Sequence, residues 1–411
     1  MSLNADLLAV LYNTEAAYCE SAASFGTALP LIDTVDLSGL AREKQPVNYT
    51  RQYFHEGYQD VLMPFVGKTV KLTGRLTGLG ASAVGAVPAS DMVTFLGLLV
   101  GASPIGLATG GTFTGGTAAA PTTSMASGVV AGALVHGGAV GDPRVGGQWL
   151  PVGGHATSIL TLLLAAPAAP NNAEVLYASR MVHPNESPGV AEILASFRLE
   201  VLTSNGHFIL RGCSMQDFKW SGMSPGELPQ WEATISVAHV FTTSATFPSA
   251  TVAQKHASTP VANGSFAYNV VGTTARLSET ARSVAINLGD TGECQIGTGG
   301  TFEGQVYQSC RRKPGKTTIE IVLDAEATGT YTWRDRAGVD PNTAPFYHAC
   351  YSLSGADGRA VGIYFPRLKL VNEPIQINDG GYNRTRVTFE ALKGLTDTSE
   401  LTRSAWRMGF A

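Results

Sequence analysis

The stretch Phe197-Arg-Leu-Glu-Val-Leu-Thr-Ser-Asn-Gly206 places a strand-like run directly before an Asn-Gly pair. Asn-Gly and Asp-Gly are the preferred central pairs of type I′ turns, because both central residues adopt a positive φ and the twist of the turn matches that of its strands. Asn205 and Gly206 are therefore predicted to form the turn of a β-hairpin. Asp357 and Gly358 follow a second strand-like run in the same way.

The two turns also stand at equal distances from later strand-like runs. Asn205 precedes Ile235 by 30 residues and Asp357 precedes Val387 by 30, so both pairs are offset by 152 (357 − 205 and 387 − 235). Small motifs can recur by chance, but the agreement of turn, strand and spacing favours a duplication. One β unit present twice is more typical of the building block of a symmetric assembly than of a catalyst.

A second pair of motifs is consistent with the duplication. Gly67-Lys-Thr69 and Gly315-Lys-Thr317 each open a run of alternating apolar and polar residues, and Val70 matches Ile319 if one residue is skipped. From the motif to the turn is 138 residues in the first copy (205 − 67) and 42 in the second (357 − 315). The first copy is therefore predicted to hold about 96 extra residues.

The extra residues, at about 92–173, are rich in Gly, Ala and Thr, and their only charged residues are Asp142 and Arg144. Residues 92–112 are long enough to span a bilayer, but they contain Pro104 and lack a basic anchor at either end. Disorder is disfavoured by apolar clusters such as 159–164. The favoured interpretation is an uncharged surface that packs against this domain or another subunit, and no membrane is expected as a partner.

A helix is predicted at the start of this segment. Ser90 can cap the first turn, and Asp91 places a negative charge at the positive end of the helix. Apolar residues then recur at helical spacing at Met92, Phe95, Leu96 and Leu99. Such a stripe more often packs in a core than lines a ligand pocket.

Composition bounds the function. The chain has 411 residues, which is enough for two or three domains. Its 28 basic and 32 acidic residues give a net charge of −4, so the chain lacks the overall positive charge that is typical of nucleic-acid-binding proteins. Its 47 Gly and 21 Pro favour strands joined by turns. An odd number of cysteines without Cys-x-x-Cys suits reduced thiols, and the N-terminus does not read as a secretory signal. The cysteines are Cys19, Cys213, Cys294, Cys310 and Cys350.

Motifs for catalysis or cofactor binding are weak. The stretch Gly222-Met-Ser-Pro-Gly226 fits the Gly-x-Ser-x-Gly pattern, but Pro225 lacks the N–H that would stabilise an oxyanion, so a β-turn is predicted. Both Gly-Lys-Thr motifs lack the earlier glycine of a phosphate loop. The eight histidines show no metal-ligand spacing. We therefore expect no enzyme, no metal and no cofactor.

Several segments resemble the major tail tube proteins of tailed bacteriophages. In the first copy these are 208–213, which ends in Gly-Cys, 218–220, and 226–235, which begins with Gly-Glu-Leu-Pro. In the second copy 361–369, Glu373-Pro374 and Gly380-Gly381 are similar to the same elements, although they lack Gly-Cys and Gly-Glu-x-Pro. The resemblance covers about two-thirds of the chain.

The resemblance implies a mainly β fold of two tandem tail-tube-like barrels or sandwiches, each flanked by a helix. The first would span 1–245, with the insertion, and the second 246–411. Three chains would form a pseudo-sixfold ring by extending their sheets, and rings would stack into a virion tail tube, assembled in the host cytoplasm, through which viral DNA passes without specific binding. A tape measure protein, a tail terminator and baseplate proteins are the further partners that it implies.

Two segments are predicted to contact the next ring. The first precedes the first Gly-Lys-Thr strand, and residues 303–313 hold the same place in the second copy; Tyr and Arg are favoured at interfaces. An ordinary solvated loop is the alternative, and a turn is predicted for the basic run before Pro314. The residues proposed for stacking are Arg42, Tyr49, Arg51, Tyr53, Arg311 and Arg312.

Functions of other classes stay open at this point. A capsid decoration or tail-fibre subunit is one alternative, although fibres usually show repeats of short period. An enzyme on a β scaffold, with its acid and base brought together from distant residues, is another. A membrane-active protein that uses residues 92–112 is the third.

Overall fold

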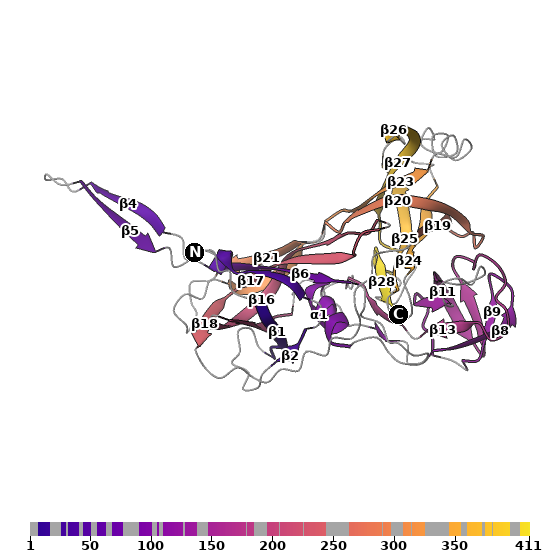
Figure 1. Cartoon of the computed structure of the whole chain (residues 1–411), viewed down its shortest axis with the longest axis horizontal. Coiled ribbons are helices and arrows are strands. Elements are labelled where there is room, and N and C mark those ends of the chain that lie inside the picture. Colours follow the sequence, from indigo (N-terminus) through magenta and orange to yellow (C-terminus); the bar gives the residue numbers. More distant parts are fainter. Residues whose placement is uncertain are drawn as a thin grey trace.

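The computed structural model shows a chain built mainly from antiparallel strands (Figure 1). It describes residues 7–16, 26–29, 32–40, 44–50, 56–62, 68–76, 90–100, 105–106, 110–125, 128–137, 147–177, 179–184, 195–204, 206–224, 226–243, 263–289, 291–296, 307–313, 315–324, 345–354, 360–371, 375–379, 381–394 and 403–411. Two β units and a smaller barrel between them make up the described structure, so the mainly β tandem fold is confirmed.

The first unit is an antiparallel sheet. In pairing order its strands are β2 (Thr27–Ala28), β1 (Leu7–Thr14), β15 (Phe197–Thr203), β16 (Gly206–Ser221), β17 (Gln230–Val237), β6 (Lys68–Arg75) and β3 (Ile32–Asp36). Beyond the end of β17, β18 (His239–Thr243) pairs with the first half of β16, and a 3-10 turn, η1 (Ser38–Leu40), follows β3. Alternation buries Val70 and Leu72 completely, as the pattern predicts.

The second unit repeats this strand order as a closed six-stranded barrel. In pairing order its strands are β19 (Asn263–Val270), β24 (Tyr347–Ser354), β25 (Val361–Leu370), β27 (Tyr382–Ala391), β23 (Thr317–Asp324) and β20 (Leu277–Asn287), which pairs back to β19. The short strands β26 (Ile375–Asp379) and β28 (Arg407–Phe410) pair with β27 and β25. In the first unit, β2 and β3 together take the place of β20, since β2 pairs with β1 and β3 with β6.

β-bulges at matching positions fix the correspondence of the units. β3 is bulged between Ile32 and Thr34, and β20 between Ala281 and Ser283. The residues opposite Ile32 and Ala281 are Gly74 and Leu323, an offset of 249 (323 − 74). The same offset matches Val70 with Ile319 (319 − 70), so the structure agrees with the one-residue shift that the Gly-Lys-Thr motifs require.

The constant offset of 152 is wrong. Val70 lies opposite Ile235 and Ile319 opposite Phe389, so Ile235 matches Phe389 and not Val387. The strands before the hairpins are offset by 150 instead, because the bulges beginning at Phe197 and Tyr347 coincide. Connections between strands differ in length between the copies, which shifts the offset from strand to strand.

The first hairpin is confirmed, but its turn is shifted. Thr203 pairs with Gly206, so Gly206 begins β16 without a left-handed φ and is not a central residue of the turn. β24 and β25 form the matching hairpin, whereas Asn205, Asp357 and Gly358 lie outside the described residues.

The single α-helix of the described residues, α1 (Ser90–Val100), belongs to the first unit and not to the insertion. Met92, Phe95, Leu96 and Leu99 are fully buried, as the core-packing interpretation predicts. The Phe95 ring lies 5.4 Å from Tyr12, 5.5 Å from Phe197 and 5.9 Å from Trp231. The segment where the second unit would hold its predicted helix, between β23 and β24, lies outside the described residues.

The insertion folds as a barrel of its own, which we call the insert barrel. It closes in the order β10 (Leu134–Gly137), β11 (Gln148–Ala156), β12 (Ile159–Leu162), β9 (Pro121–Thr123), β8 (Gly111–Gly116) and β13 (Val175–Tyr177). The short strands β7 (Ile105–Gly106) and β14 (Arg180–Val182) lead into it and out of it. The predicted bounds 92–173 therefore begin too early, because the helix at 92 is part of the first unit.

The first and second units share one hydrophobic core. Trp220 of the first packs edge-on against Trp406 of the second, with ring centroids 5.9 Å apart. The Tyr351 hydroxyl donates a hydrogen bond of 2.5 Å to the Met223 carbonyl. The junction between the units is thus a packed interior. The predicted boundary at 245–246 lies between β18 and β19, outside the described residues, and stays a prediction.

Candidate assembly interface

Each unit carries a two-stranded arm at the same place in its strand order. The first arm, β4 (Lys44–Thr50) and β5 (Glu56–Leu62), lies between β3 and β6. The second arm, β21 (Thr291–Ile296) and β22 (Tyr307–Lys313), lies between β20 and β23, which are the equivalent strands. The duplication therefore includes the arms.

The second arm docks on the first unit. β21 pairs antiparallel with β16, Thr291 opposite Asp217, beyond the point where β15 ends. A Cβ placed on Gly292 would lie 1.8 Å from the Met215 carbonyl oxygen, so the two backbones approach more closely than any side chain allows. β16 is thereby extended at its open edge by a strand of the other unit.

The first arm has no such partner within the described part of the chain. β4 and β5 pair only with each other and form a separate two-stranded sheet. Figure 1 shows them stretching away from the rest of the molecule, at the far left, whereas β21 lies along the first unit. An isolated two-stranded hairpin is marginally stable in water, so a projecting arm of this kind is expected to gain order from a partner.

A second connection between the units runs through the insertion. β28, at the C-terminal end of the second unit, pairs on one side with β25 and on the other with β14, which pairs in turn with β7. The strands that flank the insertion in the first copy thus extend the sheet of the second. In the first unit β18 occupies the place of β28, and among the described residues its far edge has no strand partner.

The insert barrel packs on the outer face of the second unit. A Cβ on Gly362 or Gly409 would lie 2.2 or 2.5 Å from the Trp149 ring, so both glycines make room for that side chain. The Trp149 backbone N–H donates to the Ser352 hydroxyl at 3.1 Å. The buried Arg407 guanidinium donates to the Gly132 carbonyl at 3.0 Å. The uncharged segment therefore packs against its own chain, one of the two arrangements expected from its composition.

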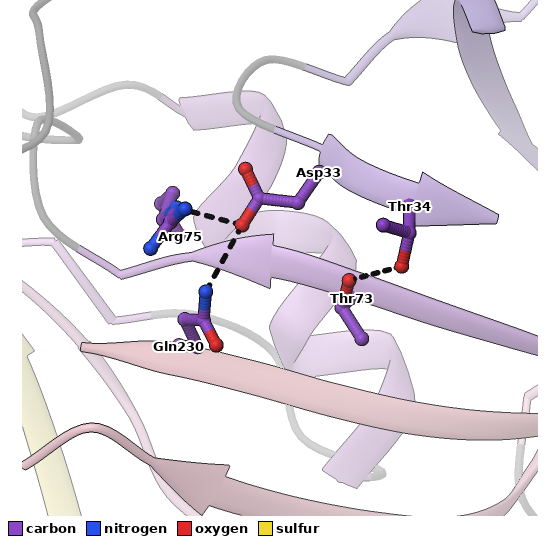
Figure 2. A network of polar contacts seen from close by, with 5 residues as sticks. All are labelled: Asp33, Thr34, Thr73, Arg75 and Gln230. Atoms are coloured by element: carbon purple, nitrogen blue, oxygen red, sulfur yellow. Dashed lines mark hydrogen bonds and ion pairs between the residues drawn. The ribbon is translucent and has the colours of Figure 1, made fainter. Parts of the chain in front are cut away.

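Matching ion pairs hold the bulged strands of both units. In the first unit Asp33, at the bulge of β3, forms an ion pair with Arg75 (2.6 Å) and accepts a hydrogen bond from Gln230 (3.2 Å) (Figure 2). In the second, Arg282 at the bulge of β20 donates to Asp324 at 2.7 Å. The acidic residue lies on β3 in the first unit and on β23 in the second, and the basic residue lies on β6 and on β20. The ion pair is therefore kept, with its two charges exchanged between the matching strands. All four side chains are partly exposed, so each pair contributes little free energy and mainly fixes the local geometry.

The structure places the predicted stacking residues unevenly. Arg311 and Arg312 lie in β22 opposite Glu293 and Gly292, so the predicted loop and turn there are wrong: the residues pair as a strand, and Arg311 is exposed. Tyr49 lies in β4, in the first arm, and only its backbone is described. Arg42, Arg51 and Tyr53 lie outside the described residues. Their role in stacking stays a prediction.

The Gly-x-Ser-x-Gly match is a turn, as predicted. The Glu227 N–H donates to the Ser224 carbonyl at 3.1 Å, and the Ser224 N–H donates to the Glu227 carboxylate at 3.2 Å. Gly222 and Gly226 have φ values of 64° and 87°. Glycine is thus required on both sides of the serine by the backbone itself.

Buried titratable groups of the second unit stay neutral. Burial raises the pKa of the Cys350 thiol to about 12 and also raises the pKa of the Tyr364 hydroxyl. Burial lowers the pKa of His348, whose ring lies 3.2 Å from the Tyr364 hydroxyl. A thiol with a raised pKa is a poor nucleophile at neutral pH. These groups act as packing beneath the insert barrel.

Within the described residues, no group of three His, Cys, Asp or Glu side chains is arranged to hold a metal ion. No described helix has the length and apolar character needed to cross a bilayer; α1, the only one in the segment considered as a span, ends at Val100. Cys213 and Cys350 are both buried.

Comparison with known proteins adds no name to this geometry. No protein-family model matches the sequence, and no curated protein matches it.

Sequence reasoning missed the features that join the units. The docked strand β21 and the short strands β7 and β14 have two to six residues each, too short for a clear alternating pattern. One signal was present: Val371 and Ile375 are apolar residues on either side of the segment Asn372-Glu373-Pro374. Both are exposed in the structure, by 47% and 55%.

Proposed function

We propose that the protein is the structural subunit of a bacteriophage tail tube. In this proposal, copies of the chain associate head to tail into rings of three, each chain supplies two of six similar positions, and the rings stack into a conduit for the genome. The subunit would be part of the virion tail, with tape measure, terminator and baseplate proteins as its further partners.

One observation carries the proposal: two units with the same strand order and bulges meet through unlike edges within the chain. The second unit contributes its arm and β28, whereas the first contributes the edge of β16 and the strand β14. Contacts between unlike surfaces repeat until they close a ring or form a filament. Among the described residues the first arm, which is the counterpart of the docked arm, pairs with no other strand, and this supports continued association.

The charge of the chain is compatible with a conduit for DNA. A net charge of −4 provides no general attraction for phosphate, so a polynucleotide could pass without adhering. Both arms lie where a subunit could reach a neighbour, in the same ring or in the next one.

Negative-stain electron microscopy of the purified chain tests the proposal. Hollow tubes or rings of uniform diameter are expected at micromolar concentration. A chain that stays monomeric as its concentration is raised would count against a tube subunit. Isolated particles that bind only to preformed capsids or fibres would instead favour another virion role.

A further inference from the structure

The docking of the second arm identifies an equivalent edge in the second unit. β21 pairs with β16 just beyond Met215, which lies opposite Ile235 of β17. Leu370 lies opposite Phe389, the residue that matches Ile235, so Leu370 is the counterpart of Met215. The chain that follows Leu370, through Val371 to β26, thus corresponds to the part of β16 that receives the second arm.

This edge is open and apolar in the second unit. Among the described residues β26 pairs only with β27, and no described strand lies on its other side. Ile375 lies opposite Arg386, and Lys219 lies opposite Glu232 at the matching position of the first unit. The second unit therefore has an isoleucine that is 55% exposed where the first unit has a lysine that forms an ion pair with Glu232. An unpaired strand edge with exposed apolar residues is a site for strand addition.

We propose that the first arm of one copy docks on the β26 edge of the next copy, with β4 as the added strand. This inference rests on the proposed function and names the partner as a second copy of the chain. β4 precedes β5 as β21 precedes β22, so it is the strand of the first arm that corresponds to the docked one. Gln45 stands where the second arm has Gly292, so the register on β26 differs from that on β16.

Two variants, each changed on one side of this contact, test the proposal. Ile375→Lys places a second positive charge opposite Arg386, whereas Lys219 at the matching position of the first unit is paired with Glu232, and an arm-less variant replaces residues 44–62 by a short Gly-Ser linker. Sedimentation velocity over a concentration series is expected to show self-association weakened about tenfold or more by Ile375→Lys and lost in the arm-less variant. Ile159→Lys, an equally exposed isoleucine of the insert barrel, is the control and is expected to assemble like the unchanged chain.

Mixing the two variants sharpens the test. The Ile375→Lys chain keeps its arm and the arm-less chain keeps its β26 edge, so an equimolar mixture is expected to form a one-to-one complex that neither forms alone. If the unchanged chain assembles and Ile375→Lys assembles as readily as Ile159→Lys, this docking is overturned while the tube proposal stands. If the unchanged chain never self-associates, the tube proposal itself fails.

Discussion

The two arms share one place in the strand order but differ in their surroundings. The second arm lies on β16 of the first unit, whereas the first arm pairs with no other described strand. The second arm reaches back to the unit that precedes its own, whereas no described strand of another unit pairs with the first arm. The second arm therefore shows, inside one chain, the kind of contact that we propose for the first arm with a second copy.

The outer faces of the two units differ as well. Arg198 and Glu200 of β15 match His348 and Cys350 of β24, because the bulges there are offset by 150 (347 − 197). In the first unit Glu200 forms an ion pair with Arg198 (2.7 Å) and accepts a hydrogen bond from His207 (2.9 Å), and all three are buried. The second unit has small or neutral groups instead, and the insert barrel covers them. One scaffold thus carries an ionic cluster on one copy and a docked barrel on the other.

Removing the side chain that docks the insert barrel should have the largest effect. Trp149→Ala opens a cavity over Gly362 and Gly409, and we expect a loss of about 3–5 kcal/mol in the free energy of unfolding. Urea unfolding followed by circular dichroism measures it. Ile159→Ala, at an exposed position of the same barrel, is the control. Equal effects of the two changes would mean that Trp149 does not anchor the barrel.

The ionic cluster of the first unit should respond to loss of its carboxylate. Glu200→Gln leaves the buried Arg198 and His207 facing a neutral amide, which is expected to cost about 3 kcal/mol or more. Glu232→Gln, which breaks the exposed pair with Lys219, should cost less than about 1 kcal/mol. Thermal unfolding of both variants compares them, and a milder effect at Glu200 would contradict a structural role for the cluster.

A substitution in the second arm, which is docked on β16, should lower the free energy of unfolding more than a substitution in the first arm. Gly292→Val places atoms against the Met215 carbonyl and is expected to cost about 1–3 kcal/mol in the isolated chain. Gln45→Val, at the matching position of the first arm, should change stability by less than about 0.5 kcal/mol. Hydrogen exchange of residues 291–296 should rise only in the first variant. Unchanged exchange there would mean that β21 does not depend on close approach to β16.

The smallest expected effect is on the pH dependence of folding stability. Burial lowers the pKa of His348 in the folded chain, so the unfolded chain binds more protons as the pH falls below about 6.5. Stability from the neutral His348 is therefore present above that pH and is lost as the pH falls toward the lower folded pKa. Urea midpoints at pH 7.5 and 5.5 should differ less in His348→Gln than in the unchanged chain, and an equal shift in both would contradict this assignment.

Much of the fold could be predicted from local patterns, and the failures have physical causes. The alternation of apolar and polar residues after Gly67-Lys-Thr69 and Gly315-Lys-Thr317 was sufficient to predict the two strands, because each strand buries one of its faces. The turn spacing gave the right hairpins but the wrong offset, since Gly206 lies in the strand and the connections differ in length. Hydrogen bonding across a sheet follows from three-dimensional register, which a single sequence does not encode locally.

The candidate interface was predicted only in part. Its place before each Gly-Lys-Thr strand was anticipated, but β22 was expected to be a loop, because its basic residues and Pro314 resemble a turn. The docking of β21 depends on Gly292 meeting Met215, a contact across 77 residues (292 − 215). The open edge at Ile375 became visible only once the two units could be superimposed strand by strand.

Native mass spectrometry of the assembled protein tests the central claim most directly. If the two units of each chain occupy equivalent positions, the smallest closed particle should contain three chains of 43.0 kDa, and larger particles should be multiples of three. A smallest closed particle of six chains, with none of three, would contradict the equivalence of the units. A monomer at every concentration would contradict the assembly itself.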